Sequence, residues 1–235
     1  MEHPFTWHSA IHPFLPYPLS LLGETNFTAL VVMGALVALA FVFRRSVSSA
    51  KDPVVPEERL SVRNAMEVLV EIVVGLSDSI IGKKGRKYVP LFGSLFLFIL
   101  LANLSGLIPG FTPPTSSFLN NLGMGLIVFV AYHYFGVREH GAGYFKQFMG
   151  PVLFLAPLFI VIELFSHVFR PVSLSIRLYG NMFGDHLVLE IFSNLTKLVV
   201  PVLFYILGTL VSVIQAAVFT ILSVIYVAMA ISHEH

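Results

Sequence analysis

Five apolar stretches, each long enough to cross a lipid bilayer as a helix, constrain the fold of this 235-residue chain more than any other feature. Hydrophobic residues make up 56% of the sequence and charged residues only 11%, whereas a soluble domain carries about 25% charged residues. Helices cross bilayers because they satisfy their backbone hydrogen bonds internally. The sequence therefore predicts an all-α, polytopic membrane protein that forms one helical domain over residues 1–235.

The expected membrane helices occupy residues 27–43, 88–108, 118–137, 151–194 and 198–230. The last two stretches exceed what a perpendicular crossing needs, because about 20 residues suffice and 44 helical residues would extend about 66 Å. We therefore expect them to form a long, tilted helical hairpin that turns near residues 193–201. Pro157 and Pro171 are the expected kink points of its first helix.

Residues 57–81 show a different pattern, in which apolar residues recur at helical spacing and charged residues lie between them. The apolar positions are Leu60, Ala65, Val68, Leu69, Ile72, Val73, Leu76 and Ile80. This pattern predicts an amphipathic helix on the membrane surface or against a partner, not a span. The basic residues that follow, Lys83, Lys84, Arg86 and Lys87, are expected to anchor it among lipid headgroups.

The polar and aromatic segment 1–26 is expected to be extended and to lie outside the cytoplasm. Its three histidines, His3, His8 and His12, are separated by prolines and do not have metal-ligand spacing. The chain contains no cysteine, so it has no disulfide and no thiolate metal site. Because the first basic residue is Arg44, the start of the chain lacks the basic region of a signal peptide. We expect no metal and no cofactor.

Basic residues predict the orientation of the chain in the membrane. Eleven of the fourteen lysines and arginines fall in the loops 44–87 and 138–147. Loops rich in lysine and arginine stay in the cytoplasm. The N-terminus is then expected outside and the C-terminus inside, after five membrane passages.

A polar stripe runs through the fourth apolar stretch, over residues 163–186. An arginine at the centre of a bilayer costs about 2.5–3.5 kcal/mol, so charged residues there require a functional explanation. At about 100° per residue, most polar groups of this segment share one narrow face of a helix. They are Glu163, Ser166, His167, Arg170, Ser173, Arg177, Asn181 and Asp185. His186 points to the opposite side. The stripe predicts either the lining of an ion path or an interface with another intramembrane charge.

Two other classes of function stay open at this point. A secondary transporter with an intramembrane charged substrate site would show an internal repeat, and the sequence has none. A membrane-embedded hydrolase or transferase could use His167, Asp185 and His186, but no nucleophile elbow or H-E-x-x-H pattern accompanies them. A phosphate-binding G-x-x-x-x-G-K-[ST] loop is also absent, so any ATP chemistry belongs to partners.

Three features together resemble subunit a of the F-type ATP synthase. They are SLSIRLYGNMFGDH in the fourth stretch, NLSGLIPG in the second and Gln215 in the last. The resemblance covers the chain from about residue 60 onward. It implies a non-catalytic, proton-translocating subunit of the bacterial plasma membrane, with ATP chemistry on partner subunits. It also implies a c-subunit ring, b-type peripheral stalk subunits, the rest of the ATP synthase complex and the lipid bilayer as partners, and no nucleic acid.

The resemblance implies roles for individual residues. Arg177 matches the essential arginine that faces the ion-binding carboxylates of the c ring. Asn181 matches the asparagine four residues later, Gln215 a glutamine close to the arginine, and Asn103 an asparagine of the second span.

Other matched positions concern the half-channels for protons. Glu163 and Ser166 match polar positions of the half-channel that opens to the outside. His186 stands where many members have glutamate, Asp185 adds an acid beside it, and Gly208 stands where some members carry an ionisable residue. These departures leave the intermediate members of the proton path open.

We therefore expect protons to enter through a wet crevice lined by Glu163, His167 and His186, and to leave after the carboxylate has met Arg177. Histidine suits such a relay because it titrates near neutral pH. Several of the candidate site residues also have a structural alternative. Arg177 could pair with Glu163 or Asp185, Ser166 and Ser173 could bond their own backbone, and Arg170 and His133 could be interfacial.

Overall fold

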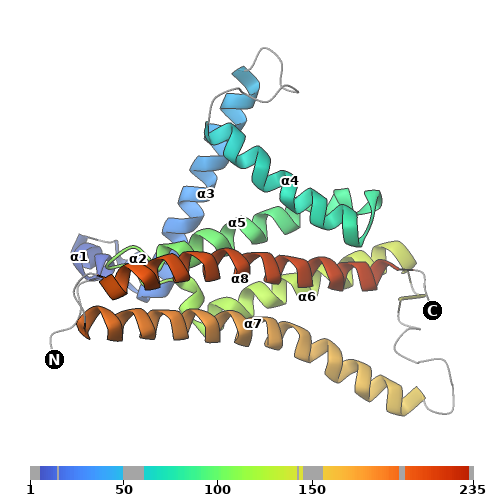
Figure 1. Ribbon diagram of the computed structural model, residues 1–235. Helices are drawn as coiled ribbons and strands as arrows, with labels where there is room; N and C mark the ends of the chain where they lie inside the picture. The colour runs from blue at the N-terminus through green and yellow to red at the C-terminus, as the bar shows by residue number, and fades with distance from the viewer. Residues whose placement is uncertain are drawn as a thin grey trace.

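The computed structural model describes residues 6–14, 16–49, 61–141, 143–144, 156–195 and 199–232. These residues form helices joined by short connections, with no strand among them (Figure 1). Five helices are long and apolar enough to cross a membrane. They lie within Glu24–Ser48, Lys83–Ser105, Phe118–His140, Pro157–Leu189 and Val200–Ile231. The prediction of an all-α, polytopic membrane protein is confirmed.

Four of the long helices form a bundle. They are α5 (Val89–Ser105), α6 (Phe118–His140), α7 (Ala156–Leu195) and α8 (Val199–Ile231). In this bundle α8 contacts α5, α6 and α7, and α6 also packs along α7. The first long helix, α3 (Glu24–Ser49), contacts α5 but leans away from the bundle (Figure 1).

Several helix ends differ from the sequence prediction. The first span was expected over 27–43, yet α3 continues through Arg44 and Arg45 to Ser49, because charge ends the apolar segment and not the helix. α6 likewise passes its expected end at residue 137 and stops at Gly141, whose φ of 58° suits glycine. α5 ends at Ser105, before its expected end at residue 108. Residues 151–155 and the hairpin turn at 196–198 lie outside the described residues.

α7 is one helix of 40 residues that contains Pro171 without breaking. Figure 1 shows its axis changing direction along its length. Pro171 lacks a backbone N–H, and the Ser175 hydroxyl donates a 2.6 Å hydrogen bond to the Pro171 carbonyl oxygen. Both features bend membrane helices. Pro157 lies in the first turn of α7, where proline is tolerated, so it does not act as the second kink point.

α4 (Val62–Ile80) is the amphipathic helix expected over residues 57–81. It begins after Ser61, whose side-chain oxygen accepts a hydrogen bond from the Asn64 N–H. Residues 57–60 lie outside the described part of the chain. The helix buries Val73 against the bundle and leaves Val68 and Ile72 exposed, and it is followed by the short 3-10 helix η2 (Lys83–Tyr88).

The N-terminal segment was expected to be extended, and this prediction is wrong. It forms α1 (Trp7–Ile11), η1 (His12–Phe14) and α2 (Tyr17–Ser20). α1 forms because the Thr6 side chain accepts a hydrogen bond from the Ser9 N–H, which caps the helix. The Trp7 indole donates to the Pro109 carbonyl at 3.1 Å, and the Trp7 backbone N–H donates to the Gly110 carbonyl at 2.9 Å. These bonds hold the segment against the connection between α5 and α6.

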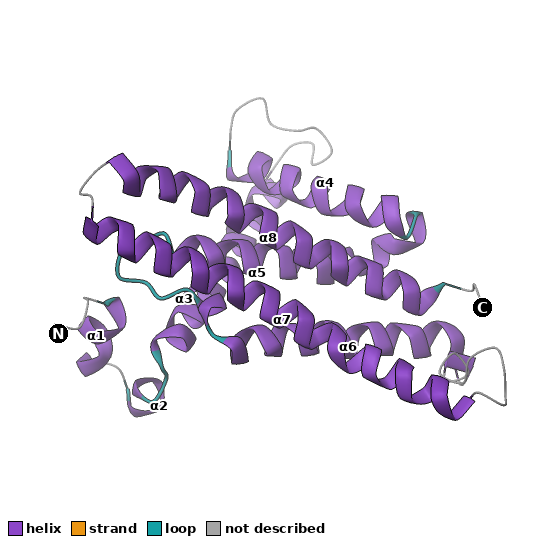
Figure 2. Ribbon diagram, turned by 60° about the horizontal axis from the view of Figure 1, so that its bottom comes forward, coloured by secondary structure: helices purple, strands orange, loops and turns teal. Residues whose placement is uncertain are grey.

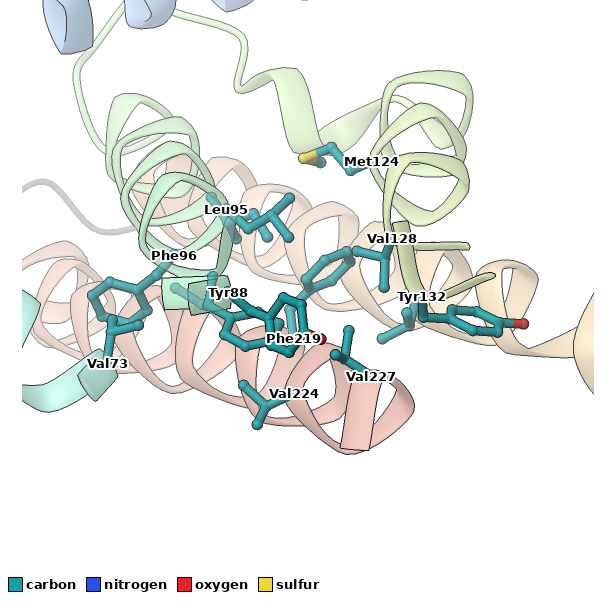
Figure 3. Packing of buried hydrophobic residues seen from close by; sticks show 14 of the residues in the cluster. Val73, Tyr88, Leu95, Phe96, Met124, Val128, Tyr132, Phe219, Val224 and Val227 are labelled. Atoms are coloured by element: carbon teal, nitrogen blue, oxygen red, sulfur yellow. The ribbon is translucent and has the colours of Figure 1, made fainter. Parts of the chain in front are cut away.

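The core lies between α4, α5, α6, α7 and α8, where apolar side chains converge (Figure 3). Its largest fully buried members include Phe92, Ile99, Val128, Tyr132 and Phe219. Inside lipid the hydrophobic effect does not drive helix association, so close packing holds the helices together. One contact is especially close, because a Cβ at Gly125 of α6 would meet the Pro171 carbonyl of α7. This contact fixes α7, which carries the polar stripe, against the bundle. Figure 2 shows α7 and α8 running along one another.

Candidate functional site

Arg177 is exposed on the outer face of α7. It lines an open groove of about 310 Å³ with Phe169, Val172, Ser173 and Ile176. Within the described parts of the chain, the guanidinium forms no hydrogen bond and no ion pair, so neither Glu163 nor Asp185 is its structural partner. A permanent charge on a membrane-facing surface is costly. Arg177 is therefore a charged group that the described residues leave without an ion-pair partner.

The side chains of Asn181 and Gln215 connect α7 to α8 one turn beyond Arg177. The Asn181 amide donates a 2.7 Å hydrogen bond to the Gln215 side-chain oxygen. Gln215 is buried and Asn181 is exposed. Gln215 was expected close to the arginine, and the structure assigns its hydrogen bond to Asn181. The pair thus fixes α8 against α7 beside Arg177.

Asp185 and His186 line a cavity of about 270 Å³ between the end of α5, α7 and α8. Its other lining residues are Gly106, Leu107, Met182, Val188, Leu189, Phe204, Leu207, Gly208 and Ser212. Among the described residues, Asp185 Oδ2 and Ser212 Oγ are buried and have no hydrogen-bond partner. Buried polar atoms without a partner cost about 1–3 kcal/mol each and call for an explanation. The lining is largely apolar, but Asp185, His186 and Ser212 supply polar groups in a space large enough to admit water.

A second pocket, of about 450 Å³, opens beside the first. Gly180, Asn181, Gly184, Asp185, Val211, Ile214 and Gln215 line it. Asp185 borders both pockets, so its carboxyl group lies between the internal cavity and the outer face of α7.

Glu163 and His167 meet nearer the start of α7. The His167 Nδ1 lies 3.0 Å from the Glu163 carbonyl oxygen and 3.4 Å from Glu163 Oε1. His167 is only 3% exposed, and its ring lies against the rings of Tyr132 and His133 of α6.

The structure separates residues that the sequence grouped into one crevice. Glu163 precedes Arg177 by fourteen residues and His186 follows it by nine, which places them about 21 Å and about 14 Å away in opposite directions along α7. A crevice shared by Glu163, His167 and His186 is therefore wrong. A helical projection shows the angle of each side chain around the helix axis but not its position along that axis.

Neighbouring contacts show which end of the bundle each group occupies. On the side of Glu163 lie the Lys87–Glu139 ion pair of 2.9 Å and a groove that brings Lys84 and Lys87 beside Ile231 and Ser232 of the C-terminal end. On the side of His186 lies the end of α5 at Gly106. The basic residues thus mark the Glu163 end.

Three further predicted site residues have distinct surroundings. Asn103 is fully buried, accepts a 2.7 Å hydrogen bond from the Thr115 hydroxyl, and lies 3.4 Å from the Ser212 carbonyl oxygen. It ties α5 to α8. Ser166 and Ser173 are exposed. In the described part of the chain neither hydroxyl bonds its own backbone, whereas Ser175 does.

Arg170, which the sequence left between an interfacial and a catalytic role, lies against aromatic rings. Its guanidinium carbon lies 5.9 Å from the centroid of Tyr132 and 5.4 Å from that of Tyr226. The two tyrosines come from α6 and α8, and sequence reasoning missed them because periodicity along one helix does not predict its neighbours. No three histidine or acidic residues of the described segments gather as metal ligands would.

Comparisons with known proteins identify the family of this chain. The family model described as ATP synthase A chain matches residues 27–228. The chain is 46% identical to an ATP synthase subunit a of Bdellovibrio bacteriovorus over 86% of this chain and 88% of that protein. It is 44% identical to ATP synthase subunit a 1 of Syntrophotalea carbinolica and 39% identical to ATP synthase subunit a of Geobacter sp. strain M21, each over the full length of both chains.

The match covers every long helix described above, including the groove at Arg177 and the cavity at Asp185. The family match excludes the alternative that the chain is a secondary transporter. The chain belongs to the ATP synthase A chain family, as a subunit a of an F-type ATP synthase.

Proposed function

We propose that this subunit a, the proton-translocating and non-catalytic membrane subunit of its ATP synthase, moves protons through two half-channels that approach Arg177 from opposite ends of α7. One observation carries the proposal: Arg177 is exposed on α7 between the Asp185 cavity and the Glu163 end, with no ion-pair partner among the described residues. The missing partner is assigned to a carboxylate of a c-subunit ring.

The surface around Arg177 supports contact with such a ring. Large apolar residues are exposed on the same two helices, Ile176, Phe183 and Leu187 on α7 and Leu203, Leu210 and Ile214 on α8. An apolar face with one cation at its centre complements a lipid-embedded ring whose carboxylates pass one at a time.

Arginine suits this position because it stays charged at every physiological pH. A nearby cation favours the ionised form of an approaching carboxylate, which then releases its proton. The same charge repels protons, so it blocks direct leakage between the two half-channels.

The entry half-channel is assigned to the Asp185 and His186 cavity and the exit to the Glu163 end. The exit end carries Lys84 and Lys87, and basic loops stay in the cytoplasm. Glu163, Ser166, His167 and Ser173 then line the exit path, Asp185 and His186 the entry path, and Asn181, Gln215 and Asn103 hold the helices between them. In this orientation the N-terminus is outside and the C-terminus is cytoplasmic.

The proposed partners follow from this role. They are the c ring at the α7–α8 face, b-type peripheral stalk subunits and the remaining subunits of the complex, which carry the ATP chemistry. The expected location is the bacterial plasma membrane, which agrees with the five apolar helices.

ATP-driven proton pumping by membrane vesicles that contain the assembled complex tests the proposal. Arg177→Ala should abolish pumping without loss of assembly, and Arg177→Lys should fail as well, because only the planar guanidinium engages a carboxylate through two parallel bonds. Arg138→Ala, at an exposed arginine near the end of α6, is the matched control. Pumping by assembled Arg177→Ala complexes at the rate of the control would refute the role of Arg177.

A further inference from the structure

His133 of α6 forms a pair with His167 of α7 that neither the sequence motifs nor the helical projection of α7 predict. Their ring centroids are 5.1 Å apart and their planes meet at 70°. We propose that His133 and His167 form a two-histidine relay that carries protons through the last part of the exit path. This inference rests on the proposed function and adds His133 to it.

The two rings present the same nitrogen for proton transfer. His133 Nδ1 lies 2.9 Å from the Phe129 carbonyl oxygen, and His167 Nδ1 lies 3.0 Å from that of Glu163. A carbonyl oxygen accepts a hydrogen bond, so each Nδ1 carries the proton of the neutral ring. Nε2 is therefore the nitrogen that gains and loses the transported proton.

Because the two histidines differ in burial, the proton is expected to move from His167 to His133. His167 is 3% exposed, so a proton that it receives reaches water only through a neighbour. His133 is half-buried and lies seven residues before the end of α6 at His140, on the side of the bundle that carries the basic residues. His133 is thus the less buried member of the pair and lies nearer the basic end of the bundle.

Charges of opposite sign set the balance at His167. The Glu163 carboxylate, 3.4 Å from Nδ1, stabilises the imidazolium, and Arg170 opposes it from one turn later in α7. The Arg170 guanidinium lies over the rings of Tyr132 of α6 and Tyr226 of α8. A histidine between an acid and a cation can both accept and release a proton, as a relay member must.

Aromatic rings pack closely around His133. Its ring contacts those of Phe129, Tyr132 and Tyr144, with centroid distances of 4.3, 4.3 and 5.8 Å. Tyr144 is buried against Gly136, where a Cβ would overlap its ring. Only glycine at position 136 leaves room for Tyr144 in this arrangement, which packs aromatic rings around His133.

Each transfer conserves charge. His167 binds a proton released by the ring carboxylate and becomes an imidazolium. His133 Nε2 then takes up a proton as His167 returns to neutral, either directly or through one bridging water. His133 finally releases its proton to water. The O–H bond of the ring carboxylic acid breaks at the start, an N–H bond forms and breaks at each histidine in turn, and an O–H bond to water forms at the end.

The test compares His133→Gln with His12→Gln in membrane vesicles that contain the assembled complex. His12 lies in η1, outside the path, and is the matched histidine control. ATP-driven pumping by His133→Gln should fall on the order of tenfold, because water replaces the lost group only in part. Added imidazole should restore pumping in His133→Gln, whereas a residue that only packs would not be rescued. Unchanged pumping in His133→Gln overturns the relay.

A double variant tests whether the two histidines act in series. His133→Gln combined with His167→Gln should pump no more slowly than the slower single variant, since one broken link already interrupts a chain. Losses that multiply would show two independent roles and overturn the relay. If His133→Gln does not assemble, His133→Glu, which retains a group that titrates, must pump with a profile shifted to lower pH, and failure of assembled His133→Glu complexes to pump also overturns it.

Arg177→Ala separates this inference from the proposed function. If Arg177→Ala abolishes pumping while His133→Gln pumps normally, only the relay is wrong. If Arg177→Ala pumps normally, the proposed function itself is wrong.

Discussion

Asn181 of α7 donates a 2.7 Å hydrogen bond to the side-chain oxygen of Gln215 of α8, one helical turn beyond Arg177. This bond joins the two helices at the depth where the arginine faces outward. The sequence suggested that Gln215 and Arg177 act together. In the structure Gln215 instead bonds Asn181 and joins the two helices, while the Arg177 side chain bonds no other described residue.

Removing this bond should loosen the hairpin. Asn181→Ala leaves the buried Gln215 oxygen without its partner and should destabilise the complex by about 1–3 kcal/mol, measured by thermal unfolding in detergent. The double variant Asn181→Leu with Gln215→Leu should recover much of that loss while pumping stays low. Thr209→Val, at an exposed hydroxyl that bonds only its own helix, serves as the control. Equal stability of Asn181→Ala and wild type would contradict this role.

Filling the Asp185 cavity should close the entry path. Gly208 lines the cavity, and a Cβ there would approach only the flexible end of Leu107, at 3.0 Å. Gly208→Leu should therefore assemble and yet lose most of its pumping and most of the passive proton conductance of the membrane sector. Gly34→Leu, on α3 where a Cβ meets nothing within 4 Å, is the matched glycine control. Wild-type conductance in Gly208→Leu would exclude the cavity from the path.

Close packing at Gly125 predicts a difference between two glycines of α6. Gly125→Ala would press its methyl group against the Pro171 carbonyl, which is backbone and cannot turn aside, so the variant should lose about 1–3 kcal/mol of stability. Gly123→Ala meets nothing within 4 Å and should gain up to about 1 kcal/mol from the higher helix propensity of alanine. The thermal unfolding temperatures of the two variants decide the matter, and shifts of the same sign would disagree with the packing described.

Asp78 and Arg86 predict a pH dependence at the end of α4. The hydrogen bond from Arg86, at 2.6 Å, lowers the pKa of the exposed Asp78 carboxyl in the folded chain. A group with a lowered folded pKa stabilises the fold above its unfolded pKa of about 3.9, and this contribution disappears as the pH falls through the folded value. Asp78→Asn should therefore lower stability slightly at neutral pH and remove this part of the acid sensitivity. High salt should reduce the difference between variant and wild type, because the pair is exposed.

The sequence predicted the helices well and their partners poorly. Apolar length identified all five candidate spans, and periodicity identified α4, because both signals are local. It misread the N-terminal segment, whose short helices depend on the Thr6 cap and on contacts of Trp7 with Pro109 and Gly110 far along the chain.

The same contrast holds for the candidate site, where features of a single helix were predictable and contacts between helices were not. The polar stripe of α7 was predicted from spacing alone, including the exposed Arg177. Its division into two ends was missed because angular position on a helix says nothing of depth. The positions of Tyr132 and His133 beside His167 could not be predicted either, because a neighbour from α6 leaves no trace in the periodicity of α7.

The contact between Gly125 and Pro171 also has a mechanical consequence. If a c ring turns against this subunit, as proposed above, α7 must resist a sideways force. Such a helix yields first where its hydrogen-bond ladder is interrupted, which is at Pro171. α6 touches α7 there, with Gly125 against the Pro171 carbonyl and the Ser175 hydroxyl. The fold thus braces its longest helix at the one turn where the force would otherwise bend it.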